Sequence, residues 1–534
     1  MEKKTFLKGA AILGVAGLLV QVLGAFFRIP LANIIGPAGM GYYQTAYPIY
    51  VFLLVFSTNG APAAISKMTS ERFAMGKPRE AHRVFKLSFI LMAVMGAIAF
   101  YGVFFGAEKI VTAFGDPGAV MAMKAIAPAL LVVPIMSVYR GYFQGMQDMA
   151  PTAGSQLVEQ AVRVAAGLTL AVVLMKKGIE AAAAGATFGT SVGPIAGLVV
   201  LAIIYGLRRK KILQGFSDEI DHEKEPAGDI VKTLLWIAVP ITIGVSILPI
   251  INLADLFIVM KRLESTGFEL QEANVLYGQL TGMAGPIINI PMALALSMAL
   301  SMVPAVAGAK ASGDKQFLEA NVKLGLRTAM IVGVPCSFGL VILAEPIMML
   351  LYPMEMESAS GASGCLSYLA MGVIFLCIGQ TMAGILQGLG KPGIAVAGLM
   401  AGFMVKLFST YMLAGISGLN VEGAAIASSL GFVTIGMFNF YAVKKLTGIN
   451  FDRDLAIFRP VVSGLAMFIV CGILYRLFNG IIGSSLACIL SIAAGAAVYA
   501  IMLIKTKAIS GPEIKLLPKG EKLHKILSRA GLVK

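Results

Sequence analysis

Charged residues are scarce in this chain. They make up 13% of its 534 residues, whereas hydrophobic residues make up 58%. A soluble globular domain carries about a quarter charged residues. Apolar runs of roughly 20 residues, each long enough to cross a bilayer, recur along the whole length. The composition therefore excludes an ordinary soluble protein and predicts an all-α polytopic membrane protein.

Residues that carry enzyme chemistry are also few. The only histidines, His82, His222 and His524, fall outside the apolar runs, and no Walker-type phosphate loop is present. We therefore expect neither an enzyme nor a cofactor. Five cysteines lie inside apolar runs without disulfide-like or metal-ligand spacing, so we interpret them as packing residues. They are Cys336, Cys365, Cys377, Cys471 and Cys488.

The formal net charge of +15 lies in the connections between apolar runs and does not indicate nucleic-acid binding. Lys and Arg concentrate at 67–86, 208–232 and 310–323 and in the tail 505–534. By the positive-inside rule these segments and both termini are cytoplasmic, in a bacterial cell membrane. The basic tail, with its interspersed Leu and Ile, is expected to lie on anionic membrane lipids; binding of a partner is the alternative.

We predict fourteen membrane spans joined by short connections. The start, "MEKKTFLKGAAILGVAGLLVQVLGA", resembles a secretory signal, but its apolar run continues to Ile35, so we interpret it as the first span. The predicted spans are 8–35, 41–66, 86–106, 123–147, 155–175, 178–207, 231–260, 274–306, 324–345, 361–389, 394–417, 422–443, 455–479 and 482–504.

Three short matches indicate an internal duplication. "YPIY" at 47–50 resembles "INIP" at 288–291 through Pro48 and Pro291, an offset of 243. "GAPAAIS" at 60–66 and "YFQGM" at 142–146 resemble segments that lie 242 and 243 residues later. Six spans per repeat make the two repeats parallel, and such halves commonly enclose a central cleft. The predicted organisation is an N-lobe (1–210), a cytoplasmic linker (211–230), a C-lobe (231–445), two extra helices (446–504) and the basic tail (505–534).

Arg28 is an unusual residue in the first predicted span. It shares one small or polar helix face with Gly14, Gly17, Gln21 and Gly24, which follow one another by three or four residues. A face of this kind suits close packing or a water-filled cleft rather than lipid. The alternative is that Arg28 reaches the outer headgroups, about 10 Å away.

The second predicted span supplies Tyr42, Tyr43, Gln44 and Tyr47 at a similar outer depth. We expect Tyr43 and Gln44 to line the same cleft as Arg28. The alternative for the tyrosines is an interfacial aromatic belt, where their amphipathic rings lie among the lipid headgroups.

Three further charges lie in the inner halves of predicted spans four and five. Glu159 and Arg163 are four residues apart, which suits an ion pair along one helix, and Arg140 lies at similar depth. A purely structural pair is one interpretation of Glu159 and Arg163. One glutamate cannot neutralise two arginines, however, so the first half of the chain keeps positive charge at both levels.

Asp255 and Lys406 are the notable charges of the second half, both near mid-membrane. Each alone costs at least about 2.5 kcal/mol on insertion scales, so a mutual pair is one interpretation. A cation site at Asp255 is the functional rival. At the offset of 243, Lys406 also corresponds to Arg163.

Two segments resemble a known family. "LGAFFRIPLANIIGPAGMGYYQTAYPIYVFLLVFSTNGAPAAISK" and "YRGYFQGMQDMAPTAGSQLVEQAVR" look like the branch of the MOP superfamily that contains stage V sporulation protein B, polysaccharide exporters and YtgP-type lipid II flippases. MurJ flippases and MATE drug exporters are relatives. The resemblance implies alternating access and a substrate of the polyprenyl-pyrophosphate-linked sugar type.

The resemblance also implies roles for individual residues. First-helix arginines of MurJ-type relatives contribute to a cationic cleft for the pyrophosphate, and Arg28 matches them by helix and depth. Further arginines of those relatives are absent here, and Arg140 and Arg163 are candidates to replace them. Some relatives bind Na⁺ through an aspartate on span seven, which Asp255 matches. Coupling to Na⁺ or H⁺ is therefore an expectation, although Lys406 could replace the ion.

Three functions remain open at this stage. The first is a flippase for a lipid-linked wall or polysaccharide precursor, which the arginines in the predicted cleft favour. The second is a MATE-like exporter of organic cations, which would concentrate carboxylates in its cleft. The third is a scaffold for envelope synthesis, which would depend on loops and tail rather than on Arg28.

Overall fold

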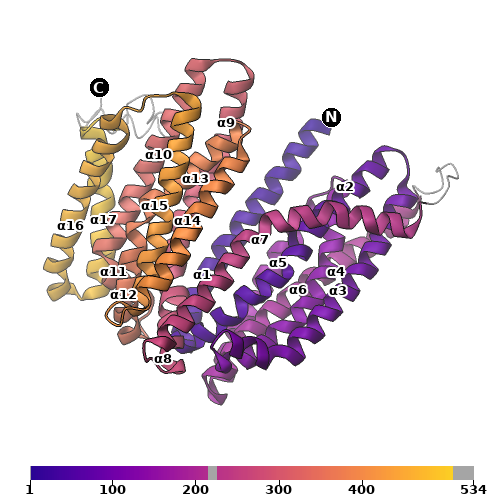
Figure 1. The fold of residues 1–534 in the computed structure, drawn as a ribbon, viewed down its shortest axis with the longest axis horizontal. Helices are drawn as coiled ribbons and strands as arrows, with labels where there is room; N and C mark the ends of the chain where they lie inside the picture. Colours follow the sequence, from indigo (N-terminus) through magenta and orange to yellow (C-terminus); the bar gives the residue numbers. More distant parts are fainter. Residues whose placement is uncertain (1, 215–224, 509–534) are drawn as a thin grey trace. The chain divides into compact units, whose positions relative to one another are not determined.

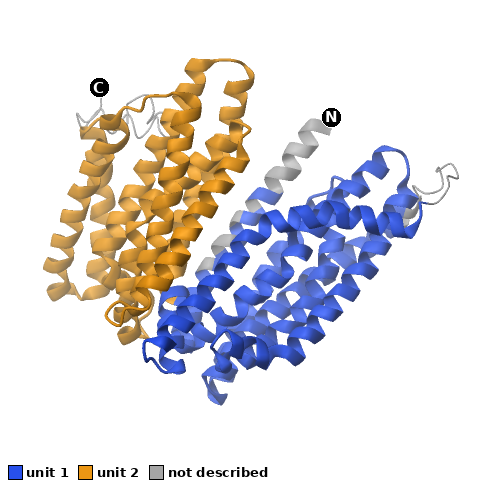
Figure 2. Ribbon diagram, viewed as in Figure 1, with its two compact units in different colours: residues 1–282 blue, residues 283–534 orange. Residues whose placement is uncertain are grey.

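The computed structural model describes residues 2–214 and 225–508, except the side chains of 2–12 and of some residues between 15 and 25 and between 210 and 214. Helices fill nearly all of this part, with no strand among the described residues. By contacts the chain divides into two compact units, Met1–Gly282 and Met283–Lys534 (Figure 2). Each unit is described by itself below.

The described residues of the first unit form helices α1 to α8 (Figure 1). They are α1 (Glu2–Val55), α2 (Ala61–Ala74), α3 (Pro78–Ala113), α4 (Val120–Gly145), α5 (Ala150–Leu174), α6 (Ile179–Gln214), α7 (Ala227–Ser265) and α8 (Leu270–Gly278). α6 packs closely against α4 and α5, and α1 packs against α5. α7 contacts α1, α2 and α3.

In the second unit, the part of the chain up to residue 508 forms helices α9 to α17 (Figure 1). They are α9 (Gly285–Ala311), α10 (Lys315–Ile342), α11 (Ala344–Leu351), α12 (Met356–Met371), α13 (Val373–Gly388), α14 (Pro392–Leu413), α15 (Asn420–Thr447), α16 (Arg459–Ile482) and α17 (Ser484–Lys505). α13 packs against α9, α10 and α15, while α16 and α17 form a helical hairpin that contacts α10.

α1 is two helices folded back on each other at Gly36. Gly36 has φ 64° and ψ −177°, a conformation that is essentially restricted to glycine. The ring centroids of Phe27 and Tyr43 are 6.4 Å apart. Sixteen residues of a straight helix would separate them by about 24 Å. The sequence between the first two predicted spans therefore folds as a tight reversal, as expected.

The described helices confirm a polytopic helical membrane fold. Twelve stretches are long and apolar enough to cross a membrane, or thirteen when the bent pair α12 and α13, at 42°, forms one span. The first stretch, Phe26–Ala74, runs through the reversal at Gly36, so the total of fourteen stays a prediction. The compact units divide at Gly282 because α7 and α8 contact α1. This division does not test the predicted repeat boundary at 211–230.

Large apolar side chains fill the core of the first unit where α2, α3, α4 and α7 meet. Met68, Met92 and Tyr142 are fully buried in this cluster. The cluster lies on α2, α3, α4 and α7, and α4 also carries the candidate residue Arg140.

Candidate functional site

Arg140, Glu159 and Arg163 form one ion cluster between α4 and α5. The two carboxylate oxygens of Glu159 accept from different arginines, at 2.8 Å from Arg140 Nη2 and 2.9 Å from Arg163 Nη2. Arg140 Nε also donates to Ser155 Oγ at 3.0 Å. The charged side chains are only 14–16% exposed. The predicted pair of Glu159 and Arg163 is confirmed, and Arg140 joins it.

A glycine stripe on α6 explains how α5 is held. The glycines at 185, 189, 193 and 197 repeat every fourth residue, so they share one face of α6. A Cβ at Gly193 would come within 2.7 Å of the Glu159 carbonyl oxygen and 2.9 Å of the Arg163 Cβ. A Cβ at Gly189 would come within 2.6 Å of Gly167 on α5. The missing side chains let the two helices approach closely, as small residues do in membrane helix pairs.

Arg28 is held by an aromatic ring. Its guanidinium carbon lies 5.8 Å from the centroid of Tyr47, on the second half of α1. Tyr47 stacks on Tyr43, with centroids 5.6 Å apart and an interplanar angle of 13°, and also contacts Tyr50 at 5.9 Å. Within the part of the chain that the structure describes, Arg28 makes no ion pair.

The tyrosines connect the two groups of charges. Tyr43 lies within electrostatic range of both Arg28 and Arg163, and Arg163 lies within the same range of Tyr47 and Tyr50. The ion cluster of Arg140, Glu159 and Arg163 has a net charge of +1, and with Arg28 the four residues retain two positive charges. No second carboxylate lies within ion-pair distance of these arginines in the described residues.

One donor of the cluster is buried without a partner. Arg163 Nε makes no hydrogen bond in the structure, although it is shielded from solvent. A guanidinium presents five N–H donors in a planar fork that matches phosphate and carboxylate oxygens. The site therefore has positive charge that Glu159 does not neutralise and an N–H donor that Glu159 does not use.

Gln44 has a different environment from the other predicted site residues. Its side chain is buried and donates to the Thr281 carbonyl oxygen at 2.8 Å. Nearby, Asn274 Nδ2 donates to the Ala38 carbonyl oxygen at 2.8 Å. These two bonds fasten the second half of α1 to the segment from α8 to Thr281. Gln44 therefore makes a contact that holds two helices together. The side chain of Gln21, another predicted site residue, lies outside the described residues.

Asp255 and Lys406 lie in different units. Asp255 is buried on α7 and interacts electrostatically with the buried Tyr277 of α8. Lys406, on α14, packs its Cβ against Gly431 of α15. The predicted pairing of Asp255 with Lys406 stays a prediction.

The proposed cation site at Asp255 also stays a prediction. The described residues contain no group of three or more His, Cys, Asp or Glu side chains that could hold a metal ion. A cation at Asp255 would therefore have to draw on carbonyl, hydroxyl or water oxygens, which Na⁺ accepts as a hard ion. His82, the one histidine in the described part, packs among aromatic rings and stacks on Tyr205 at 6.3 Å.

A buried carboxylate outside the spans was missed from the sequence. Asp116 lies between α3 and a short turn, Pro117–Ala119, and accepts from Thr45 Oγ1 at 2.7 Å. Burial raises the pKa of the Asp116 carboxyl to about 6, while the Thr45 hydrogen bond opposes that rise. Glu180, at the start of α6, raises the pKa further. Nothing in the spacing of these residues indicates that the fold brings them together.

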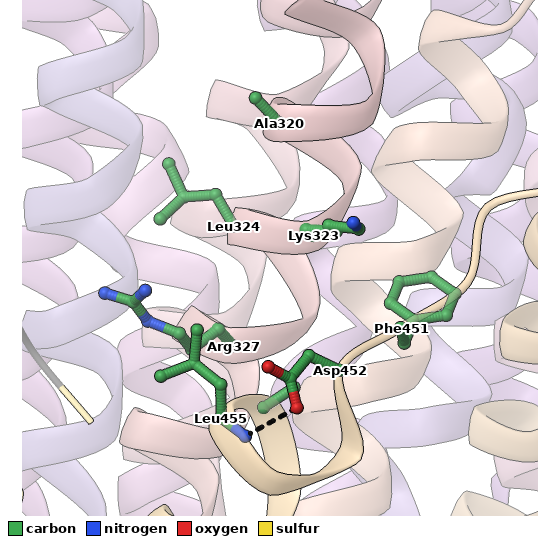
Figure 3. A pocket seen from close by; sticks show the side chains of 8 residues that line it. Ala320, Lys323, Leu324, Arg327, Phe451, Asp452 and Leu455 are labelled. Atoms are coloured by element: carbon green, nitrogen blue, oxygen red, sulfur yellow. Dashed lines mark hydrogen bonds between the residues drawn. The ribbon is translucent and has the colours of Figure 1, made fainter. Parts of the chain in front are cut away.

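The second unit has a cavity of about 260 Å³ between α10 and the segment before α16, lined by apolar side chains and a few charged ones (Figure 3). Lys323 and Arg327 extend from α10 in different directions, and the Asp452 carboxylate lies beside the Leu455 backbone. Asp452 Oδ1 accepts from the backbone N–H of Leu455 at 3.2 Å, and Lys323 pairs with Glu319 at 2.6 Å. With acids beside its bases, this cavity lacks the excess of positive charge found around Arg163.

The chain is similar to two protein families and to several curated proteins. The polysaccharide biosynthesis protein family matches residues 6–310, and the MatE family matches residues 281–412. Stage V sporulation protein B of Bacillus subtilis is 29% identical over 419 residues, covering 78% of this chain and 79% of that protein. Lipid II flippase MurJ of the same organism is 29% identical over 419 residues, covering 75% of this chain and 76% of that protein.

A solved structure shows the same fold. Lipid II flippase MurJ in an inward closed conformation has a TM-score of 0.67 at 16% identity, covering 92% of this chain and 98% of that one. The family match extends over more than half of the chain and includes α1, which carries Arg28, and α4 and α5, which carry the ion cluster. The MurJ relative and the MurJ structure are both named as lipid II flippases. The chain therefore belongs to the polysaccharide biosynthesis protein family.

Proposed function

We propose that this protein is a flippase that moves a polyprenyl-pyrophosphate-linked wall or polysaccharide precursor from the inner to the outer leaflet of the cytoplasmic membrane. Lipid II is the leading candidate for the precursor, and alternating access is the proposed mode. Both termini are proposed to be cytoplasmic. The observation that carries the proposal is the group of three arginines that retains two positive charges on α1, α4 and α5.

The chemistry of a diphosphate diester fits this group. Its two phosphate groups carry two negative charges at neutral pH and accept several hydrogen bonds. Guanidinium binds phosphate oxygens through paired N–H donors, and such charge-assisted bonds are strong in a low dielectric. Arg163 Nε supplies one donor that no protein group uses. The polyprenyl chain can remain in the bilayer while only the headgroup contacts the arginines.

The membrane potential favours the proposed direction. An inside-negative potential drives an anion outward, and each charge that crosses is worth about 2.3 kcal/mol per 100 mV. Two charges would therefore contribute about 4.6 kcal/mol per 100 mV. Na⁺ or H⁺ coupling through Asp255 is a separate proposal that this estimate does not require.

Export of organic cations is the second candidate, because residues 281–412 match the MatE family. A cation would be repelled by the arginines around Glu159, which makes this candidate the weaker one. A scaffold role in envelope synthesis is the third, and it does not require Arg28 at all.

Complementation tests the proposal directly. Arg28→Ala should fail to support growth of a bacterial strain that lacks its lipid II flippases, although the variant reaches wild-type abundance in the membrane. Lys261→Ala, at an exposed surface pair with Glu264, is the matched control and should support growth. Normal growth with Arg28→Ala would reject the role of Arg28 in substrate binding.

Reconstitution distinguishes the three candidates. Purified protein in vesicles should transfer the headgroup of a labelled polyprenyl-diphosphate sugar between leaflets, measured by its accessibility to an added enzyme. Transport of an organic-cation dye instead would favour the second candidate. Absence of both activities, with growth still dependent on the protein, would favour the scaffold.

A further inference from the structure

We infer that Tyr47 is the positioning residue that holds the Arg28 guanidinium beside Arg163, so that one diphosphate can contact both. The inference rests on the proposed function. It assigns a role to Tyr47, which does not itself bind the charged diphosphate. Tyr47 acts through Arg28, with which its ring is in contact.

The fold of α1 creates this contact. Arg28 and Tyr47 are nineteen residues apart, which corresponds to about 28 Å along a straight helix. The reversal at Gly36 brings the guanidinium carbon to 5.8 Å from the ring centroid. A flexible arginine side chain has many rotamers, so a fixed ring beside its charged end removes much of that freedom.

Tyr47 is itself held firmly. It stacks on Tyr43, whose side chain is 3% exposed and contacts Phe27, the residue that precedes Arg28. Tyr50, 5% exposed, supports Tyr47 from the next turn. Phe27, Tyr43, Tyr47 and Arg28 thus form a closed set of contacts between the two halves of α1. Movement of the Tyr47 ring would require Tyr43 to move with it.

The Tyr47 ring also offsets part of the repulsion between Arg28 and Arg163. Tyr43, Tyr47 and Tyr50 lie within electrostatic range of Arg163, and Tyr43 and Tyr47 also lie close to Arg28. Two phenol rings therefore border both guanidiniums. The face of an aromatic ring carries negative potential and attracts a cation without neutralising it. A carboxylate at the same place would also hold Arg28, but it would cancel the charge that a diphosphate needs.

Two assays of the full-length protein test the inference. The first measures binding of geranyl diphosphate, a water-soluble prenyl diphosphate, to purified protein in nanodiscs. The second measures transfer of a labelled polyprenyl-diphosphate sugar in vesicles as a function of its mole fraction. Both use wild type, Tyr47→Phe, Tyr47→Leu, Arg28→Gln and the double variant Arg28→Gln/Tyr47→Leu. Tyr101→Leu, at an exposed ring on α3, is the control.

Loss of the ring face should weaken affinity while the maximal transfer rate changes by less than about twofold. From the usual strength of a cation–π contact we expect Tyr47→Leu to raise both the dissociation constant and the half-saturating lipid fraction by roughly three- to thirty-fold. Tyr47→Phe keeps the ring face and should behave like wild type, as should Tyr101→Leu. In the double variant the leucine should add nothing to the effect of Arg28→Gln, because the two residues act as one unit.

Several outcomes would overturn the inference. Additive effects in the double variant, a defect in Tyr47→Phe, or a lower maximal rate with unchanged affinity would each show that Tyr47 acts independently of Arg28. Wild-type protein that fails to bind the diphosphate would overturn both proposals. If the binding pattern holds but no lipid is transferred, the positioning role stands and the flippase proposal fails.

Discussion

Glu159 is predicted to be the residue whose loss most destabilises the arginine cluster. Glu159→Gln removes the one carboxylate that bridges Arg140 and Arg163. Two guanidiniums then face each other at 15–16% exposure with no counter-charge among the described residues. Removing one partner of a buried ion pair costs about 3–5 kcal/mol. Partial exposure places this site at the lower end, about 3 kcal/mol.

That loss should be visible as a lower melting temperature. For a unit of the size of Met1–Gly282 we expect about 2 °C per kcal/mol, and so a decrease of about 6 °C. The assay is the fraction of protein that remains monodisperse in size-exclusion chromatography after heating in detergent. A thiol-reactive dye is less suitable, because all five cysteines lie in the second unit and would report its unfolding instead.

Two comparison variants make the result interpretable. Glu264→Gln breaks an exposed pair with Lys261 at the same 2.9 Å separation, and it should lower the melting temperature by about 1 °C or less. Glu159→Gln/Arg163→Gln restores the original net charge of the three-residue cluster and should recover part of the lost stability. If Glu159→Gln is as stable as Glu264→Gln but transfers no lipid, Glu159 acts on the substrate and the structural interpretation is wrong.

Two further predictions concern α1 and its outer connection. Gly36→Ala should destabilise the protein by about 1–3 kcal/mol, because φ 64° with ψ −177° excludes a Cβ. Gly17 has open space around it, so the control Gly17→Ala should change the melting temperature little. Equal stability of the two variants would contradict a strained reversal. Asp116 has a folded-state pKa of about 6 against an ordinary 3.8, so its contribution is fully present below pH 3.8 and decreases by roughly 3 kcal/mol as pH rises to about 6. Melting temperatures from pH 4 to 7 should therefore decrease less steeply for Asp116→Asn than for wild type, and identical slopes would show that Asp116 is not buried as described.

The sequence predicted the helical membrane fold because span length and hydrophobicity are local properties. The reversal of α1 was also predictable, since Gly36 and Pro37 interrupt an apolar pattern. The pair of Glu159 and Arg163 followed from their spacing along one helix. Each of these depends on residues that are near one another in the chain. The total of fourteen spans and the repeat layout depend on more than local pattern and stay predictions.

Contacts between distant helices were less predictable. Gln44 was grouped with Tyr43 because both lie at a similar outer depth, but adjacent helical residues point in different directions. Tyr43 turns toward Arg28 and Arg163, whereas Gln44 turns toward Thr281. Tyr50 continues the spacing of Tyr43 and Tyr47 by three residues, which places all three on one face. That periodicity was a signal for Tyr50 as part of the site.

The kind of partner that stabilises an intramembrane arginine indicates its role. Glu159 stabilises Arg140 and Arg163 by opposite charge, and this reduces the field that the two arginines present. Tyr47 stabilises Arg28 through the face of its ring, and the charge of Arg28 remains available. A chain that needed only to bury Arg28 would be served equally well by an acidic neighbour. Conversely, Tyr47→Glu should keep Arg28 in place yet abolish diphosphate binding, which separates the positioning of Arg28 from the use of its charge.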